Sequence, residues 1–560
     1  MEYMFYYCSS VRSLDLSSFD TTEVTDMNNM FGSCNSLEYI NLKSFSTRNV
    51  KDMNSMFSGD FSLTSLDLSN FDTSNVEDMK YMFNGCKELE NLDITGFKTN
   101  KVTNMEYMFC SCHKLKNIDL SDFDTSKVTL MTSMFSECRS LTSLDLSYFD
   151  VTKVRNFVCT FLGCWNLIDI NLSNFRTNSA ISFDGMFQEC RSLKSLDISA
   201  FNTTLVESMK STFKDCWALT SLDFSNFKTP NVLSLSFTFD NCRELKSLDL
   251  SKFDTSKVIL MNNMFGNCSS IISIELSNFI TKEVISMEKM FDNCSSLKYI
   301  DVSNFEGDNL KTINYMFNNC NSLTSLSFPK FQTNTLQSMQ KVFVNCTSLV
   351  YLDISKMNTE QINNFDSLFY GCESLASLNL LNFKTSMATH FSNMFKNCTK
   401  LTSLDLSNFD TSSAYSYYSM FENCKSLSYL NIDNFNTKEA TDMNSMFKNC
   451  ESLTSINVKG FKTDRVYQMY DMFYQCKSLA YLDLSNFRTE KVNDMSYMFY
   501  GCSNLNELNI SSFNTGKCFS FNNMFDECKN NMTLIIHSYY CQNLYSIIPK
   551  YINIENITFI

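Results

Sequence analysis

The chain has 560 residues, a formal net charge of −14 and a hydrophobic content of 44%. An acidic chain lacks the basic footprint that nucleic acids and anionic membranes require, so we expect no nucleic acid and no membrane surface as a partner. No apolar run approaches the roughly 18 residues that span a bilayer, so no membrane insertion is expected. The hydrophobic content is sufficient for a large packed core.

The opening segment MEYMFYYCSS matches the second half of a motif that recurs along the chain. Its Met, Phe and Cys residues stand 26 residues before Met30, Phe31 and Cys34. It has neither the basic start nor the apolar block of a signal peptide. The chain therefore looks truncated at its N-terminus, or else this end docks onto another molecule, because a partial repeat exposes its apolar face.

The motif recurs every 26 residues without insertion or deletion. Phe occupies one position in 21 successive repeats, from Phe5 to Phe525. It occupies a second position, from Phe19 to Phe513, in 19 of 20 repeats, and Met357 is the exception. A fixed period of this length indicates a solenoid. Residues 1–528 are therefore predicted to form one repeat domain of about 21 units, the first of them partial.

The repeat at residues 63–88 shows the expected elements in order. The segment 66–68 alternates apolar and polar residues, which predicts a strand. Thr73 lies in a following turn, where it is expected to make hydrogen bonds. Residues 76–83 place apolar side chains three and four apart, which predicts one or two turns of α- or 3₁₀-helix. Gly85 then stands where that helix must stop, because Gly accepts a left-handed conformation.

The LxxLxL pattern, the Phe that follows it and the MFxxCxxL segment resemble the BspA-like leucine-rich-repeat surface proteins of bacteria and protists. FDTSxVxxMxxMF is similar to the 26-residue form of that repeat, and the resemblance covers residues 1 to about 528. It implies an α/β repeat solenoid: a right-handed coil with a parallel β-sheet on the concave face and short α- or 3₁₀-helices on the convex face. It also implies a cell-surface or secreted protein that adheres to matrix proteins, to other cells or to itself.

Twenty of the 24 cysteines form one column from Cys8 to Cys528, which only Asp60 interrupts. Stacked thiols lie about 4.8 Å apart, whereas the Cβ atoms of a disulfide are about 3.8 Å apart. We interpret the column as buried reduced thiols, and the alternative is a redox-closable or metal-loading ladder. Four cysteines outside the column are expected to be more reactive: Cys110, Cys159, Cys518 and Cys541.

Catalytic groups are sparse. The three histidines, His113, His390 and His537, share no column, so they predict neither a triad nor a metal cluster. No Gly-rich phosphate loop is present. The sequence therefore predicts a protein that is not an enzyme and has no cofactor.

Acidic residues line the predicted outer strand face. Four carboxylates of one column are candidates for a cation ladder: Asp67, Asp93, Asp119 and Asp145. Neighbouring carboxylates about 5 Å apart repel by about 1 kcal/mol in water. Serine hydroxyls and solvent are expected to offset this repulsion, and the alternative is weak Ca²⁺ binding between coils.

Tyrosines interrupt the serine column beside these carboxylates. Exposed Tyr on a rigid sheet is a side chain that protein and glycan recognition uses. The alternative is that Tyr acts only as a good strand former. The candidate ligand-binding residues are Tyr299, Tyr351, Tyr429 and Tyr481, with Asp301, Asp353 and Asp483.

Residues 529–560 depart from the repeat and are predicted to form a C-terminal cap. The closing ITFI is apolar, so it is either buried or an edge that receives another chain.

Three functions remain open from the sequence. The first is a surface or secreted protein that mediates adhesion by binding a protein or glycan through its concave strand face. The second is a structural subunit that assembles end to end into extracellular filaments, because head-to-tail contacts that do not close give fibres. The third is an intracellular interaction scaffold, which the many unpaired thiols favour.

Overall fold

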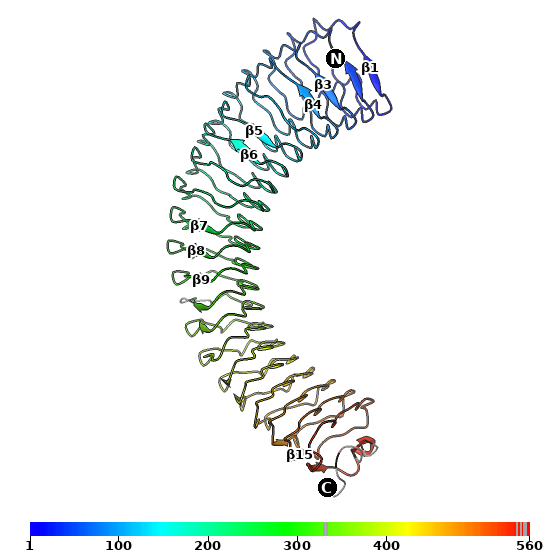
Figure 1. Cartoon of the computed structure of the whole chain (residues 1–560), viewed down its shortest axis with the longest axis vertical. Helices are drawn as coiled ribbons and strands as arrows, with labels where there is room; N and C mark the ends of the chain where they lie inside the picture. The colour runs from blue at the N-terminus through cyan, green and yellow to red at the C-terminus, as the bar shows by residue number, and fades with distance from the viewer. Residues whose placement is uncertain (329–330, 332–333, 545–546, 549–551, 553–556, 560) are drawn as a thin grey trace. The chain divides into compact units, whose positions relative to one another are not determined.

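The computed structural model describes residues 1–328, 331, 334–544, 547–548, 552 and 557–559. The chain divides into two compact units, Met1–Phe279 and Ile280–Ile560. Within each unit the chain forms a stack of parallel coils of 26 residues (Figure 1). The predicted repeat solenoid of about 21 coils is therefore confirmed as a parallel β-solenoid.

The strands are short, and one faces the next at a spacing of 26 residues. Unit 1 contains β1 (Ser13–Asp15), β2 (Tyr39–Asn41), β3 (Ser65–Asp67), β4 (Asn91–Asp93), β5 (Ser143–Asp145), β6 (Asp169–Asn171), β7 (Ser247–Asp249) and β8 (Ser273–Glu275). Unit 2 contains β9 (Tyr299–Ile300), β10 (Ser325–Ser327), β11 (Tyr351–Asp353), β12 (Ser403–Asp405), β13 (Tyr429–Asn431), β14 (Tyr481–Asp483), β15 (Glu507–Ile510), β16 (Thr533–Ile536), the 3₁₀-helix η1 (Gln542–Leu544) and β17 (Ile557–Phe559).

The parallel sheet is discontinuous. Inside unit 1 the strands pair as β1–β2, β3–β4, β5–β6 and β7–β8, and inside unit 2 as β10–β11 and β12–β13. In five coils the residues at the strand position form no strand, namely 117–119, 195–197, 221–223, 377–379 and 455–457. Backbone pairing on the strand side therefore does not hold the whole stack together.

Continuous backbone pairing lies instead at the turn ladder, which we define as residues 79–86 and their equivalents in every coil. Every second amide donates to the next coil, as Tyr81 N does to Glu106 O at 2.9 Å and Phe83 N to Met108 O at 2.9 Å. The amides between them donate three residues back within the same coil. Within each unit, each coil is thus joined to its successor by a regular series of hydrogen bonds.

The short helices expected on the convex face are absent from the described residues, because the turn ladder replaces them. A helix requires right-handed backbone throughout and donation to the carbonyl four residues back. Here Tyr81 has a φ of 57° and Gly85 a φ of 77°, and both equivalent positions are left-handed in every coil. The sequence predicted the left-handed position at Gly85 correctly, but the one at Tyr81 was missed.

Two buried columns of Phe fill each unit. In unit 1 the rings of Phe83 and Phe109 stack with centroids 5.6 Å apart, and in unit 2 Phe395 and Phe421 stack at the same distance. Offset stacking of this kind adds about 0.5–1.5 kcal/mol per pair to the burial of the rings. Thr73 and its equivalents are buried beside these rings and make hydrogen bonds between coils, as predicted.

The strand side is not the concave side of either unit. Rings of the Phe column at the turn ladder are closer together than rings of the Phe column that follows the strand. Representative centroid distances at the turn ladder are 5.5 Å for Phe31–Phe57 and 5.6 Å for Phe421–Phe447, against 6.5 Å for Phe45–Phe71 and 6.4 Å for Phe435–Phe461. A stack bends toward its shorter side, so the turn ladder lies inside the curve of each unit. The expected concave sheet is therefore wrong.

The C-terminal segment continues the stack with longer strands. β14, β15, β16 and β17 form one parallel sheet in that order, and Leu534 of β16 pairs with both Leu508 and Ile557. The closing segment, predicted to be buried or an edge, is β17 with an exposed Phe559, while Ile560 lies outside the described residues. Whether residues 529–560 act as a cap stays a prediction.

Candidate functional site

Three carboxylates of the predicted cation ladder are the last residues of β3, β4 and β5, and Asp119 has the equivalent position in a coil without a strand. Each is held by the residue two positions on. Oδ1 of Asp67 accepts the Ser69 amide at 3.1 Å and the Ser69 hydroxyl at 2.7 Å. These hydrogen bonds hold the pKa of Asp67 below its ordinary value. Amide donation to Oδ1 recurs at Asp93 at 3.0 Å, Asp119 at 3.0 Å and Asp145 at 2.9 Å. Local hydrogen bonds therefore satisfy one oxygen of each carboxylate, as the first interpretation expected.

Three of these carboxylates also share a groove on the strand side of unit 1. Asp67, Asp93 and Asp119 line a hollow of about 530 Å³ together with Glu90 and Lys116, and we call it the acidic groove. Asp145 is not among the lining residues. No group of three or more His, Cys, Asp or Glu side chains within the described residues has metal-binding geometry. Ca²⁺ binding in this groove stays a prediction.

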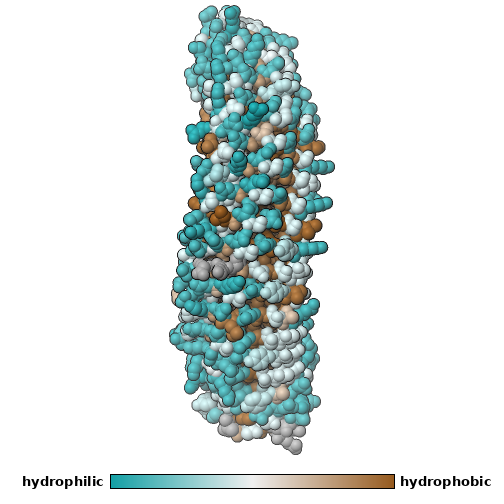
Figure 2. Space-filling view, turned by 90° about the vertical axis from the view of Figure 1, so that its left-hand side faces the viewer, coloured by the Kyte–Doolittle hydropathy of each residue, from teal (hydrophilic) through white to brown (hydrophobic). Residues whose placement is uncertain are grey.

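The four candidate tyrosines open strands of unit 2 and point away from the core. Their exposed fractions are 61% for Tyr299, 56% for Tyr351, 56% for Tyr429 and 49% for Tyr481. The first two lie two coils apart, as do the last two, with Ser325 and Ser455 in the intervening coils. Seen from one side, the surface is mainly hydrophilic, with hydrophobic side chains scattered between (Figure 2).

The carboxylates beside these tyrosines repeat the geometry of unit 1. Asp301, Asp353 and Asp483 each accept the amide of the residue two positions on, at 2.8, 3.0 and 3.0 Å. Tyr429 additionally lines a separate hollow of about 290 Å³ with Leu378, Leu381 and Asp405. The structure thus does not gather the seven candidate residues into one pocket; it distributes them along the strand side.

From Cys34 to Cys528 the cysteines of the column are buried, whereas Cys8 in the first coil is half-buried. Buried thiols of the column donate to a Phe carbonyl of the preceding coil, as Cys112 Sγ does to Phe83 O at 3.2 Å. Burial raises the pKa of Cys346 to about 12, so a thiolate is strongly disfavoured. Greater reactivity outside the column stays a prediction: burial raises the pKa of Cys518 and of Cys541 to about 11, less than for Cys346, and Cys110 and Cys159 are only half-buried.

Asp60, which replaces Cys in this column, is fully buried. Its Oδ1 accepts the Cys34 amide at 2.9 Å, while its Oδ2 has no hydrogen-bond partner among the described residues. Burial raises the pKa of this carboxyl well above its ordinary value. A protonated Asp60 therefore suits this position better than a carboxylate does.

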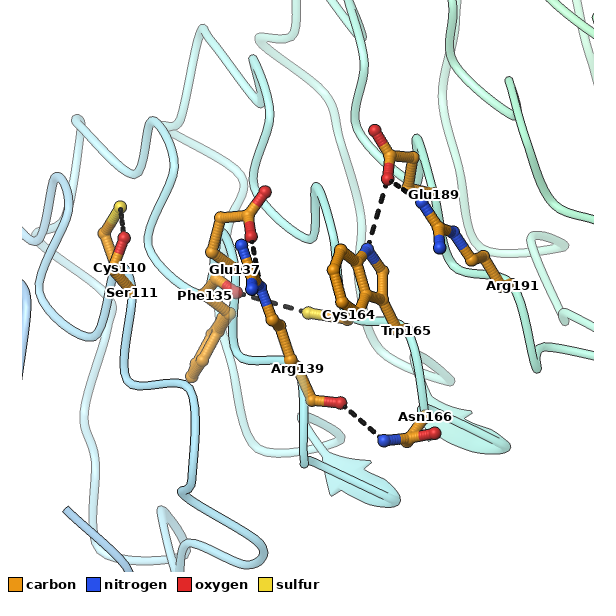
Figure 3. Close-up of polar contacts among 10 residues, drawn as sticks. All are labelled: Cys110, Ser111, Phe135, Glu137, Arg139, Cys164, Trp165, Asn166, Glu189 and Arg191. Carbon is orange, nitrogen blue, oxygen red and sulfur yellow. Dashed lines mark hydrogen bonds and ion pairs between the residues drawn. The ribbon is translucent and has the colours of Figure 1, made fainter. Parts of the chain in front are cut away.

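A ladder of alternating Arg and Trp side chains crosses five coils of unit 1, in the column directly after the buried cysteines. This Arg–Trp ladder was not among the predicted site residues and consists of Arg139, Trp165, Arg191, Trp217 and Arg243. Guanidinium carbons lie 4.2–4.6 Å from the ring centroids, so arginines cover both faces of each Trp. Figure 3 shows Trp165 between Arg139 and Arg191. Both tryptophans of the chain belong to this one column.

Residues equivalent to Gly85, the second of the two left-handed positions in each coil, hold the Arg–Trp ladder in place. Glu137 accepts from Arg139 Nε at 2.7 Å, and Glu189 accepts from an Arg191 terminal nitrogen at 2.6 Å and from Trp165 Nε1 at 3.1 Å (Figure 3). Charge-assisted bonds of this length orient the planar guanidinium groups. The signal available in the sequence was the recurrence of Arg, Trp, Arg, Trp, Arg at intervals of 26 residues.

The histidines lie apart from one another. His390 Nδ1 is 2.7 Å from Thr389 Oγ1, and Nε2 contacts the Tyr415 hydroxyl. His113 is in unit 1, whereas His390 and His537 are in unit 2.

A search of the described residues for a membrane-crossing helix, one both long and apolar enough, finds no candidate.

These features define a class of protein: a parallel β-solenoid of 26-residue coils, in which the core columns recur and the outer columns vary. Models of the family described as "Mycoplasma protein of unknown function, DUF285" match residues 1–117, 84–195, 160–270, 233–351, 337–456 and 418–539. The chain therefore belongs to this family. Comparison with curated proteins gave no match.

Solved structures similar to the chain include bacterial leucine-rich-repeat proteins. One from Bacteroides ovatus ATCC 8483 is 19% identical, with 69% of this chain and 81% of that chain covered and a TM-score of 0.34. A leucine-rich cell surface protein from Faecalibacterium prausnitzii A2-165 is 19% identical, with 61% and 79% covered and a TM-score of 0.27. A leucine-rich-repeat protein from Leptospira interrogans is 14% identical, with 94% and 95% covered and a TM-score of 0.23. At these scores the similarities carry no functional assignment.

Proposed function

We propose that this protein is a non-enzymatic cell-surface or secreted repeat protein of the BspA-like type, which mediates adhesion by binding a protein or glycan through its strand face. The observation that carries the proposal is the exposure of Tyr299, Tyr351, Tyr429 and Tyr481 at the starts of strands in unit 2. Exposed rings on a rigid backbone supply large contact areas at a small cost in side-chain entropy.

The surroundings of these tyrosines support recognition by polar as well as aromatic contacts. Asp353 lies two residues after Tyr351 and receives both the amide and the hydroxyl of Ser355. Its orientation is therefore fixed before a partner arrives, which reduces the entropy lost on binding. Strand-face side chains in this arrangement suit a partner surface with donors that reach carboxylates and apolar groups that cover tyrosine rings.

Binding of the purified full chain to immobilised matrix proteins and to a glycan array tests the proposal. We expect Tyr351→Ala and Tyr429→Ala each to weaken binding about tenfold or more, as truncation of a central aromatic residue does. Tyr467→Ala is the matched control, because Tyr467 is 50% exposed but lies off the strand face, two residues before the turn ladder begins. Equal binding by all three variants would overturn the proposal.

The other functions that the sequence left open can be tested on the same purified protein. Growing fibres in negative-stain images would favour an end-to-end filament subunit over a monomeric binder. The intracellular scaffold gains nothing from the free thiols, because burial and raised pKa values keep them reduced in either compartment. Ca²⁺ dependence of binding would support the cation ladder at the acidic groove.

A further inference from the structure

We propose that unit 1 carries a second binding site beside the Arg–Trp ladder, which takes an extended acidic peptide segment of a partner protein. The site is a hollow of about 610 Å³ that we call the basic groove. Its lining residues are Lys116, Ser140, Thr142, Asn166, Ile168, Arg191, Ser192, Lys194 and Ala218. This site is separate from the strand-face tyrosines of unit 2.

The groove runs along the stacking direction, because its lining residues recur at intervals of 26. Ser140, Asn166, Ser192 and Ala218 directly follow members of the Arg–Trp ladder, while Lys116, Thr142, Ile168 and Lys194 form the column next to the strands. An elongated hollow across several coils fits an extended chain better than it fits a compact ligand.

Hydrogen bonds between coils fix the floor of the groove. Asn166 Nδ2 donates to Arg139 O at 2.9 Å, as Figure 3 shows, and the Ile168 amide donates to Thr142 O at 2.9 Å. The ladder side is equally constrained, since Arg191 is held between two Trp rings and by Glu189. The groove is therefore formed before a ligand binds, which limits the entropic cost of association.

The charge of the lining residues selects an acidic occupant. Lys116, Arg191 and Lys194 line the groove, and no carboxylate is among the lining residues. Lys116 is paired with Glu90 at 3.5 Å in an exposed contact, which a ligand carboxylate can replace at little cost. Lys194 has no ion pair within the described part of the chain and is exposed. Arg191 is paired with Glu189 at 2.6 Å, so within the described residues Lys194 is the lining cation that no carboxylate neutralises.

The spacing of the cations indicates the form of the peptide. Lys116 and Lys194 belong to one column on the strand side and lie three coils apart. Rings of the Phe column that follows the strand are 5.9–6.3 Å apart in these coils, which places the two lysines roughly 18 Å apart. An extended chain rises about 3.3 Å per residue and points alternate side chains to opposite faces, so two acidic residues with about five residues between them match this span on one face. Ile168, 55% exposed between the two lysines, matches an apolar residue that lies between them on that face.

The ladder itself argues against a sugar as the occupant. Saccharides commonly stack on an open aromatic face, whereas arginines cover both faces of Trp165 and of Trp217. A long polyanion would also meet the carboxylates of the adjacent acidic groove, which shares Lys116 with the basic groove. A short acidic peptide avoids that repulsion.

Intrinsic fluorescence tests the proposal, because both tryptophans of the chain lie in the ladder. The full chain is titrated with a capped synthetic peptide that has two Glu residues with about five residues between them, and Val two positions after the first Glu, so that all three side chains lie on one face of the extended peptide. We expect a saturable change in Trp emission, weakened about tenfold or more by Lys194→Glu, which places a carboxylate at the groove. Lys298→Glu is the matched control, since Lys298 occupies the same column position in unit 2 and is likewise exposed.

Each outcome decides the proposal. Binding that is lost in Lys194→Glu and kept in Lys298→Glu supports it, as does loss of binding when the two Glu residues of the peptide are replaced by Gln. Equal affinity of the two protein variants, or of the Glu and Gln peptides, overturns it. A heparin fragment that changes Trp emission when the peptide does not would also overturn it, in favour of a sulfated glycan.

Discussion

Unit 1 and unit 2 are built from the same coil, but they differ in the column that follows each buried cysteine. In unit 1 this column contains the Arg–Trp ladder, preceded by Lys87 over the ring of Phe61. In unit 2 the same column contains neither Arg nor Trp. Ser295, Asn321, Thr347, Glu373 and Thr399 are followed there by Lys425, Glu451 and Lys477, which form ion pairs between coils, and then by Ser503 and Lys529. Core columns therefore determine how the chain coils, while an outer column can change completely without disturbing the fold.

The column of left-handed residues equivalent to Gly85 also differs between the two units. In unit 2 its amides bond to one another between coils, as Asn345 does to Asn319 at 2.8 Å and Asn449 to Asn423 at 2.6 Å. In unit 1 the equivalent Glu137 and Glu189 bond to arginines instead. One backbone position thus supports either an amide ladder or the anchors of a cationic surface.

The largest expected effect tests whether the two cores are equivalent. Phe135→Ala in unit 1 and Phe421→Ala in unit 2 each remove a fully buried, stacked ring. We expect each to lower the free energy of unfolding of its own unit by about 3–5 kcal/mol. Urea denaturation combined with hydrogen exchange would measure the two losses separately. A difference of more than about 1 kcal/mol between them would show that the cores are not equivalent.

The cysteine column is broken only in unit 1, and Asp60→Cys would repair it. Burial raises the pKa of Asp60 above its ordinary value of 3.8, so the folded chain binds this proton more tightly than the unfolded chain. The natural chain should therefore lose stability as pH rises from that ordinary value toward the raised one. We expect the variant to lack this loss and to gain about 2 kcal/mol at neutral pH.

Thermal unfolding of both forms across pH measures this gain. Cys320→Asp places the same carboxyl in the unbroken column of unit 2 and serves as the reverse control. A gain for Asp60→Cys that does not grow with pH would contradict the assignment of a buried protonated carboxyl.

Replacing Trp165 by Ser converts one rung of unit 1 into the type found in unit 2. Loss of two cation–π contacts and of ring burial should cost about 2 kcal/mol. Because Trp165 and Trp217 both contact Arg191, the costs of removing each should not add. Denaturation of the single and double variants measures this coupling, and strictly additive costs would mean that the ladder is not a cooperative unit.

The smallest expected effect concerns the left-handed position that Tyr81 occupies in its coil. Ser211 in unit 1 and Ser445 in unit 2 have φ values of 56° and 55°. Gly adopts this region without the steric cost that L-residues carry, but it loses more entropy on folding. We expect Ser211→Gly and Ser445→Gly each to stabilise by about 0.5 kcal/mol. A destabilisation in one unit alone, seen by thermal unfolding, would show that the two backbones differ there.

The sequence alone predicted the stacking, because strict periodicity forces equivalent residues into contact. It also predicted the buried Phe columns, the bonding of Thr73 and the left-handed backbone at Gly85. It failed at residues 76–83, since apolar spacings of three and four fit both a helix and turns with bonds three residues back. A helix and such turns differ in whether every second amide donates to the next coil, and the apolar spacing carries no information about this bonding.

The candidate surfaces were harder to predict than the fold. Asp67 and Tyr351 were found because exposed strand residues alternate with buried ones. The curvature of the strand side was predicted wrongly, since it depends on small differences in ring spacing between the two Phe columns. The Arg–Trp ladder was not predicted because no single repeat distinguishes its Arg or Trp residue. The pattern appears only when residues 26 apart are compared.

The bonding of the turn ladder has a consequence for how such a chain changes over time. Each coil presents to the next the same amides, carbonyls and aromatic cross-section that it receives from the previous one. Excising or duplicating one whole period would bring matching edges together again. Length is thus free to vary in steps of one coil, and a newly gained coil can diverge on its outer surface while its interior already fits.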